Sequence, residues 1–454
     1  MSPAPIPTSA RIVVVGGGAA GICTAWYLKQ AGYRSVTVLE KSPRLGGKCR
    51  SLTVRGESFD LGANYITSAY KRVRELAAHV DAEMYTEKPG HVIDVATGEM
   101  QSIFREILNR TGVATLAWQS LRFLLIRWKL RKLVSPASPG FTRVEEHPEI
   151  QGDFRSWLKR NGLSGLAEMF EIPLTLMGYG ELEDIAAVYA LTYMQPRTFL
   201  NLGLFAINFP LRSWPKRFSR GYGRLFERLA AEVDVVTGAK ILSIKREDTI
   251  TVEYRLLVQE LEAESEIRET ATFDYLILAC PQLPEVLEPF LTLSREEKRL
   301  MEQVRYNPFY VTTYVAPGTE RVAAVTFSLP VPELGEPFVV TRQYPDNDYI
   351  SVYTRGGSDG EIDRDYVEKK NVSFLKKIGA EDPEVPPKSS DDWAYFPHVT
   401  PEAVDQGFYT DFASLQGENR TYYVGGLLAF ELVETIAEHA QNLVETHFQG
   451  RSQP

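Results

Sequence analysis

The chain has 454 residues, of which 44% are hydrophobic and 24% are charged, as in globular proteins with two or three folding units. With 50 basic and 59 acidic side chains, its formal net charge is −9. An acidic chain does not supply the basic surface that nucleic-acid phosphates require, so nucleic acid is not expected as a partner. The three cysteines, Cys23, Cys49 and Cys280, are too few and too scattered for a disulfide framework or a metal cluster, and no metal site is expected.

The chain shows no sign of a membrane span. Its first ten residues, MSPAPIPTSA, contain no apolar run of a signal peptide, so we expect a cytoplasmic protein. Segment 113–134 joins large apolar and aromatic side chains to five basic ones, Arg122, Arg127, Lys129, Arg131 and Lys132. Such a helix could lie on a membrane surface as a peripheral contact and draw lipid from it. The alternative, which we favour, is a helix packed on the protein with a solvated basic face.

Residues 11–47 carry the most informative pattern. The β-branched run 11–15 predicts a strand buried on both faces, and it ends in Gly16-Gly17-Gly18-Ala19-Ala20-Gly21, which fits Gly-x-Gly-x-x-Gly. A predicted helix, 22–31, and a second strand, 36–39, lead to Glu40. The glycines permit a tight turn, a close approach to pyrophosphate and close helix packing, while the helix N-terminus holds the phosphates. This context predicts a Rossmann-type dinucleotide site. Glu40 would accept hydrogen bonds from the ribose hydroxyls, and its charge would disfavour the 2′-phosphate of NADP.

The next residues indicate which dinucleotide binds. Arg44, Gly46, Gly47 and Lys48 follow Glu40 and Lys41, and an Asp60-Leu61-Gly62-Ala63-Asn64 turn comes after them. This arrangement resembles the superfamily of flavin amine oxidases, phytoene desaturases and protoporphyrinogen oxidases, in which such residues line FAD. The resemblance implies an FAD-dependent enzyme. The cofactor-binding residues it implies are Gly16, Gly18, Ala19, Ala20, Gly21, Glu40, Lys41, Arg44, Gly46, Gly47, Lys48, Gly62, Ala63, Asn64, Ile241, Gly425, Gly426 and Leu427.

The same resemblance implies an α/β fold with a discontinuous Rossmann-type FAD-binding domain. We expect FAD-domain segments at 1–85, 211–285 and 406–454, a helical cap at 86–210 and a mixed-sheet substrate domain at 286–405. The strand around Ile241 would offer backbone groups to the adenine. Gly426 stands where the superfamily has an acid that binds a ribityl hydroxyl, so we expect that hydrogen bond to be lost or to come from the backbone. No second strand, glycine turn and helix unit follows, and no NADPH site is expected.

Three further motifs resemble flavin-dependent polyunsaturated fatty-acid double-bond isomerases. They are Met177-Gly178-Tyr179-Gly180 together with 186–189, the segment 395–399, and the turn 46–49. The resemblance implies a lipophilic substrate that gives a hydride from an allylic or bis-allylic carbon to flavin N5 and receives it back at another carbon. The protein must then hold the substrate chain and exclude water. Tyr179, Tyr395 and His398 are our candidate catalytic side chains, with structural packing as the alternative role for each.

Other functions remain open. An amine oxidase is disfavoured, because segment 304–311 has no lysine to place near N5 and no cysteine after Cys280 could attach the flavin. A desaturase or oxidase of a lipophilic or polyketide-like substrate shares the hydride step and differs in the fate of the reduced flavin. A flavin-binding scaffold without turnover is the non-enzyme alternative. A free fatty acid would also need a cation for its carboxylate, for which Lys88, Arg197 and Arg305 are candidates.

Overall fold

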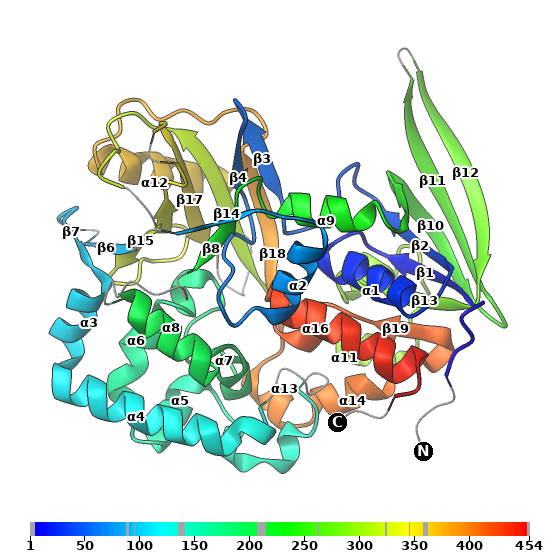
Figure 1. Cartoon of the computed structure of the whole chain (residues 1–454), viewed down its shortest axis with the longest axis horizontal. Helices are drawn as coiled ribbons and strands as arrows, with labels where there is room; N and C mark the ends of the chain where they lie inside the picture. The colour runs from blue at the N-terminus through cyan, green and yellow to red at the C-terminus, as the bar shows by residue number, and fades with distance from the viewer. Residues whose placement is uncertain are drawn as a thin grey trace.

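The computed structural model describes residues 5–87, 90–94, 96–134, 141–206, 215–260, 263–322, 325–344, 346–356 and 362–451. A parallel sheet with its helices occupies one side of the molecule, a mixed sheet lies beside it, and a group of helices lies below the mixed sheet (Figure 1).

The parallel sheet has the strand order β19-β13-β1-β2-β9. These strands are β1 (Arg11–Val15), β2 (Ser35–Glu40), β9 (Asp234–Thr237), β13 (Tyr275–Leu278) and β19 (Thr421–Tyr423). The central strand β1 is buried on both faces, since Ile12 and Val14 belong to one core while Val13 and Val15 belong to another. Burial on both faces explains why the sequence of β1 is apolar at every position from Ile12 to Val15. Strands that are far apart in the chain thus form one Rossmann-type sheet, which confirms the predicted fold class.

Helices cover one face of the parallel sheet (Figure 1). They are α1 (Ala19–Gln30), α2 (Lys71–His79), α9 (Gly223–Ala230) and α16 (Val433–Leu443). The opposite face packs against an antiparallel sheet of β10 (Ala239–Arg246), β11 (Ile250–Glu260) and β12 (Ala263–Phe273), together with α10 (Pro284–Leu287) and α11 (Arg295–Met301). Gly238, with φ of 68°, separates β9 from β10, so the apolar alternation at 233–244 serves two different sheets.

The mixed sheet has the order β18-β14-β17-β16-β15-β6-β7. Its strands are β6 (His91–Asp94), β7 (Met100–Ser102), β14 (Arg305–Val315), β15 (Val325–Leu329), β16 (Pro337–Thr341), β17 (Tyr349–Arg355) and β18 (Ser390–His398). Helix α12 (Arg364–Lys377) packs on this sheet. The expectation that the chain becomes helical from about residue 86 is wrong at its start, because β6 pairs in parallel with β15 and extends the sheet.

The helical group begins at Ile103 and surrounds an aromatic core. Its helices are α3 (Ile103–Thr111), α4 (Val113–Lys129), α5 (Phe154–Arg160), α6 (Ala167–Glu171), α7 (Ala187–Tyr193) and α8 (Pro196–Ala206). Phe123 of α4 contacts Trp157, Phe170 and Phe199 through their rings, with centroids 4.7 to 6.5 Å apart. Phe123 thereby fixes α4 against α5, α6 and α8.

Short elements complete the structure. They are β3 (Ser51–Val54), β4 (Glu57–Asp60), β5 (Met84–Thr86), β8 (Lys216–Phe218), α13 (Pro401–Asp405), α14 (Phe408–Ser414) and α15 (Gly426–Ala429). Among the helices that the structure describes, none is both long enough and apolar enough to cross a bilayer.

Candidate functional site

A cavity of about 870 Å³ is lined from both the parallel and the mixed sheet. One end is lined by the glycine turn after β1, the 44–48 turn and the 425–426 turn, and much of the rest by α3, α6, α8, the loop that carries Tyr179 and strands of the mixed sheet. Of the predicted cofactor-binding residues, all except Gly21 and Leu427 line this cavity. Residues from the beginning, the middle and the end of the chain therefore meet around one space.

The glycine turn divides its roles between packing and access. A Cβ on Gly21 would lie 1.9 Å from the carbonyl oxygen of Gly16, so this glycine allows the helix to pack against the strand. A Cβ on Gly18 would meet only the Cα of Gly47, at 3.9 Å, and would project into the cavity that both residues line. Gly18 caps α1 without a side-chain hydrogen bond, which leaves N–H groups of the first turn for a ligand. This cradle fits the pyrophosphate of FAD.

Glu40 fixes the turns around it. Its Oε2 accepts a hydrogen bond from the backbone N–H of Gly17 at 2.6 Å, and its Oε1 accepts one from that of Ser42 at 2.7 Å. Each carboxylate oxygen keeps a further lone pair, so Glu40 retains the capacity to accept from ribose hydroxyls. The backbone N–H of Gly46 donates to the carbonyl of Gly17 at 2.9 Å, which joins the two glycine turns side by side.

The C-terminal turn contains a carboxylate that the sequence motif did not reveal. Gly425 has φ of 146°, and a Cβ on Gly426 would lie 3.2 Å from the Cβ of Glu431. Glu431 lines the cavity, forms an ion pair with the Nζ of Lys48 and accepts a hydrogen bond from the backbone N–H of Phe396. The side chain of Glu431 thus lies next to position 426, where the superfamily has its acid. The partner of this carboxylate is Lys48, the residue after Gly46-Gly47.

The remainder of the cavity, which we call the apolar arm, is walled by aliphatic and aromatic side chains. They include Ile103, Ile107, Met169, Phe170, Ile172, Leu176, Met177, Tyr179, Tyr193, Phe199, Leu202, Tyr306, Phe309, Phe327, Phe338, Tyr353, Trp393 and Tyr395. Among the described lining residues, every Asp, Glu, Lys and Arg belongs to the cofactor end: Glu40, Lys41, Arg44, Lys48, Lys240 and Glu431. The apolar arm therefore suits a hydrophobic substrate.

Tyr179 and Tyr395 lie together on the wall of the apolar arm. Their ring centroids are 5.4 Å apart, and the ring of Tyr395 also lies 4.9 Å from that of Phe309. Burial raises the pKa of both tyrosine hydroxyls well above the ordinary value. Both phenols therefore stay protonated near neutral pH, and their contribution to the cavity is a pair of neutral rings with polar tips.

His398 occupies a different environment. Its buried ring stacks on that of Phe396, with centroids 4.9 Å apart, and its Nδ1 donates to the carbonyl of Phe396 at 2.7 Å in the neutral tautomer. Burial lowers its pKa to about 4, and it is not among the residues that line the cavity. The structure thus places Tyr179 and Tyr395 together on the cavity wall and places His398 outside the cavity lining.

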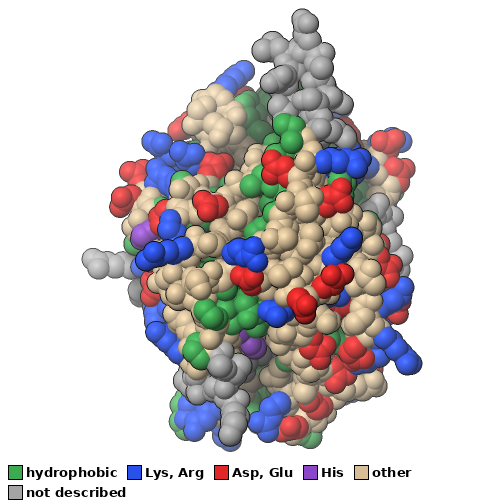
Figure 2. All heavy atoms as spheres, turned by 90° about the vertical axis from the view of Figure 1, so that its right-hand side faces the viewer, with side chains coloured by type: hydrophobic (Ala, Val, Ile, Leu, Met, Phe, Trp, Pro, Cys, Tyr) green, Lys and Arg blue, Asp and Glu red, His purple; other side chains and the backbone are tan. Residues whose placement is uncertain are grey.

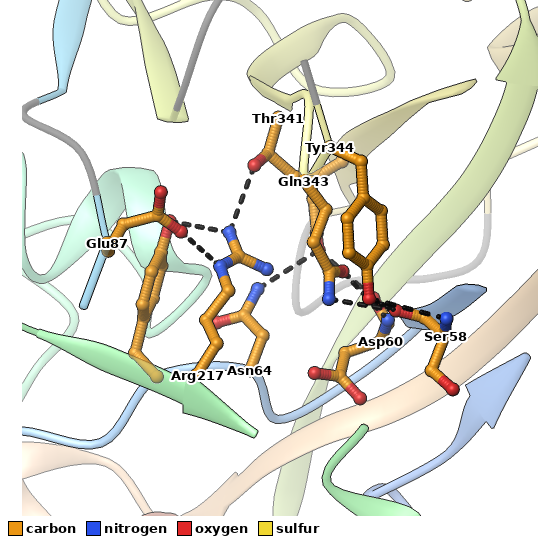
Figure 3. Close-up of polar contacts among 10 residues, drawn as sticks. Ser58, Asp60, Asn64, Glu87, Arg217, Thr341, Gln343 and Tyr344 are labelled. Atoms are coloured by element: carbon orange, nitrogen blue, oxygen red, sulfur yellow. Dashed lines mark hydrogen bonds and ion pairs between the residues drawn. The ribbon is translucent and has the colours of Figure 1, made fainter. Parts of the chain in front are cut away.

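A buried polar network borders the apolar arm (Figure 3). Arg217 of β8 pairs with Glu87 and donates from Nη2 to the hydroxyls of Tyr65, at 2.8 Å, and Thr341, at 3.0 Å. Tyr65 and Thr341 line the cavity, whereas the Arg217 side chain has no exposed surface. Nearby, burial raises the pKa of Asp60 to about 6. This network joins Tyr65, which follows the 60–64 turn, to β8 and β16, and it holds the cavity wall formed by Tyr65 and Thr341 in position.

Two of the three candidate cations for a substrate carboxylate lie apart from the cavity lining. Arg197 and Arg305 are exposed and do not line the cavity. Lys88 lies outside the described residues. A carboxylate clamp at Arg197 or Arg305 is therefore not supported by their positions.

Several lining residues were missed from the sequence. Tyr193, Tyr306 and Trp393 stand in elements that the apolar pattern marks only as helix or strand, and Glu431 is the first acid after the glycine turn at 425–426. The missing acid at Gly426 was itself a signal, since a search for the next carboxylate along the chain would have found Glu431.

Comparison with known proteins agrees with this geometry. The profile of the family described as flavin containing amine oxidoreductase matches residues 19–407. A phytoene desaturase (neurosporene-forming) of Rhodobacter capsulatus is 35% identical over 100 residues, which are 21% of this chain and 19% of that protein. Protoporphyrinogen oxidase 2 of Arabidopsis thaliana is 44% identical over 66 residues, which are 14% and 13% of the two chains. The matched part thus spans less than a fifth of these curated relatives.

Solved structures match over nearly the whole length. A CLA-producing fatty acid isomerase from P. acnes superposes with a TM-score of 0.82 at 20% identity, covering 97% of this chain and 99% of that one. A variant of putrescine oxidase superposes with a TM-score of 0.64 at 16% identity, covering 95% and 97%. At these identities the likeness shows the fold, and the family profile shows the membership. The chain belongs to the flavin containing amine oxidoreductase family, which implies FAD as its cofactor.

Proposed function

We propose that this enzyme is a double-bond isomerase of a lipophilic unsaturated substrate. A hydride would leave an allylic or bis-allylic carbon and return to another carbon of the same molecule. The observation that carries this proposal is the apolar arm, which adjoins the FAD cradle and whose described lining contains no Asp, Glu, His, Lys or Arg side chain. A reaction that moves a hydride needs a dry, shaped space more than an acid or a base.

FAD, when bound, supplies an acceptor for two electrons and a hydrogen that can also give them back. The chain's own residues hold the substrate and protect it. Loss of a hydride leaves a positive charge spread over neighbouring double bonds, and the ring faces of Tyr179, Tyr395 and Phe309 can stabilise such a cation. The apolar wall excludes the water that would otherwise add to it.

The tyrosine hydroxyls do not act as bases in this proposal. Both phenols have pKa values raised well above the ordinary value by burial, so an isomerisation through a carbanion would lack a proton acceptor at Tyr179 or Tyr395. The similarity in fold to a CLA-producing fatty acid isomerase supports the same assignment.

A desaturase or oxidase is the second candidate. The sequence similarity to a phytoene desaturase favours it, and an apolar cavity suits its substrates equally well. The two functions share the first step and differ in whether the hydride returns to the substrate.

The test is an anaerobic incubation of FAD-loaded protein with polyunsaturated fatty acids and neutral polyenes, followed by product mass and flavin colour. We expect a product of unchanged mass with flavin that is still yellow at the end. A bleached flavin with a product lighter by two hydrogen atoms would replace the isomerase with a desaturase or oxidase. Free FAD with the same substrates is the control.

A further inference from the structure

Helix α4 has two different faces. Phe123 and Arg127 are buried against the other helices, whereas large apolar side chains follow one another along the outer side. These residues, which we call the α4 face, are Trp118, Leu121, Leu125 and Trp128, and they are 64%, 52%, 54% and 59% exposed. Their spacing places them on one stripe of the helix. The structure thus shows a packed helix, as favoured from the sequence, that also leaves an apolar stripe uncovered.

Two further large hydrophobic residues are exposed on α4 and its neighbour. They are Val113, the first residue of α4, and Leu200 of α8, a helix that contacts α4. The other exposed large hydrophobic residues in the described part of the chain lie on other elements: Ile267 on β12, Tyr366 on α12, and Leu334 and Val385 in loops. Single exposed apolar residues are ordinary, whereas a continuous stripe indicates an interaction surface.

The charged side chains of α4 and the residues that follow it all have one sign. Segment 113–134 contains five basic side chains and no acidic one, in a chain whose net charge is −9. Arg122, Lys129, Arg131 and Lys132 are exposed, and the guanidinium of Arg131 lies 4.2 Å from the ring centroid of Trp128. On the side of the molecule that carries the FAD-binding sheet, acidic and basic side chains are instead interspersed (Figure 2).

The helices next to α4 form walls of the cavity. Phe199 and Leu202 of α8 line the apolar arm, while Leu200 of the same helix is exposed. Ile103 and Ile107 of α3, the helix that precedes α4 in the chain, also line the arm. Helices α3 and α8, which both contact α4, thus also line the cavity.

We propose that the α4 face binds the surface of an anionic lipid bilayer, with α4 lying in the headgroup region and its cations on the anionic lipids. Tryptophan, leucine and flanking arginine and lysine form the pattern of helices that lie in such interfaces. A second copy of the chain fits less well, because two α4 faces brought together would place cations against cations.

The substrate would then pass from the bilayer into the apolar arm beside α3 and α8. This second step rests on the proposed function, since it requires a lipophilic substrate, whereas binding to the bilayer does not. The two are therefore tested with separate measurements.

The experiment is co-sedimentation of FAD-loaded protein with vesicles of phosphatidylcholine alone and of phosphatidylcholine mixed with phosphatidylglycerol. We expect binding to the mixed vesicles that weakens as salt is added. The variant Trp118→Gln with Leu125→Gln should bind at least tenfold more weakly, because it removes two apolar anchors from the exposed side of the helix. Lys129→Gln with Lys132→Gln should reduce the preference for anionic vesicles, by about fivefold per cation.

Ile267→Gln is the matched control, since it removes an exposed apolar side chain from β12, away from α4. It should bind vesicles as the unchanged protein does, and all variants should keep FAD and the same melting temperature. Equal sedimentation of the Trp118→Gln, Leu125→Gln variant and the unchanged protein would overturn the proposal. So would a dimer, detected by light scattering, that this variant abolishes.

The delivery step is tested with a substrate in vesicles and a short, water-soluble polyene. The variant of Trp118 and Leu125 should lose turnover only of the substrate embedded in vesicles. If vesicle binding is confirmed but neither substrate is isomerised by the unchanged protein, the proposed reaction fails and the membrane surface stands.

Discussion

Gly18→Val separates the cofactor role of the glycine turn from its structural role. Gly18 has φ of −74° and ψ of −176°, an extended conformation that valine adopts readily. A Cβ at this position meets only the Cα of Gly47, at the ordinary contact distance of 3.9 Å, so the apoprotein should keep its stability. The valine methyl groups would instead occupy the cradle at the N-terminus of α1.

The magnitude follows from the contacts that the phosphates would lose. One or two charge-assisted hydrogen bonds, at about 1.5–3 kcal/mol each, give a loss of about 3 kcal/mol, or about 150-fold in Kd. The assay is titration of apoprotein with FAD by flavin fluorescence, with the melting temperature of the apoprotein as the second readout. Gly21→Ala is the contrasting variant, since its Cβ would lie 1.9 Å from the carbonyl oxygen of Gly16 and should destabilise the fold itself. An unchanged FAD affinity in Gly18→Val would refute the cradle.

Three further predictions concern the rest of the site. Glu431→Gln should lower the free energy of unfolding by about 1–2 kcal/mol in denaturant titrations, because it breaks the half-buried pair with Lys48; Glu296→Gln, in an exposed pair, should change it by less than about 0.5 kcal/mol. Tyr179→Phe should keep turnover, whereas Tyr179→Leu should lower it about tenfold through loss of a ring face; a large loss in Tyr179→Phe would instead assign a role to the hydroxyl. His398 has its folded-state pKa lowered to about 4 from 6.5, so stability should fall as pH drops from about 6.5 to about 4, by at most about 3 kcal/mol, and His398→Phe should flatten that slope in unfolding curves.

The sequence was most informative where structure is local. Strand β1, the glycine turn, helix α1 and strand β2 were predicted because buried runs and glycine spacing act over a few residues. Strand β12 carries many charged residues and most of its described side chains are exposed, so it offered no buried period to read. Strand β6 is short and pairs with β15, more than two hundred residues away, which no local pattern reveals; β7 joins the sheet by pairing with β6.

For the site, too, the sequence predicted the features that depend on local patterns and missed those that depend on contacts between distant residues. The glycines and basic residues at 16–48 were found from spacing, and they line the cavity together with Ile241 and the turn at 425–426. The apolar arm could not be assembled from the sequence, because Tyr179 meets Tyr395 only when a loop of the helical group packs against β18. The sequence also could not tell that the ring of His398 points toward Phe396. The domain boundaries at 85, 210, 285 and 405 stay a proposal.

The central claim is that one hydrogen leaves the substrate and returns to it. It is tested most directly with a polyunsaturated substrate that is dideuterated at its bis-allylic carbon, incubated anaerobically with the FAD-loaded enzyme in ordinary water. A product that keeps both deuterium atoms, one of them on a different carbon, is the predicted result, because the apolar arm excludes exchange with solvent. A product in which one deuterium has been replaced by solvent hydrogen would contradict the account and point to proton transfer instead.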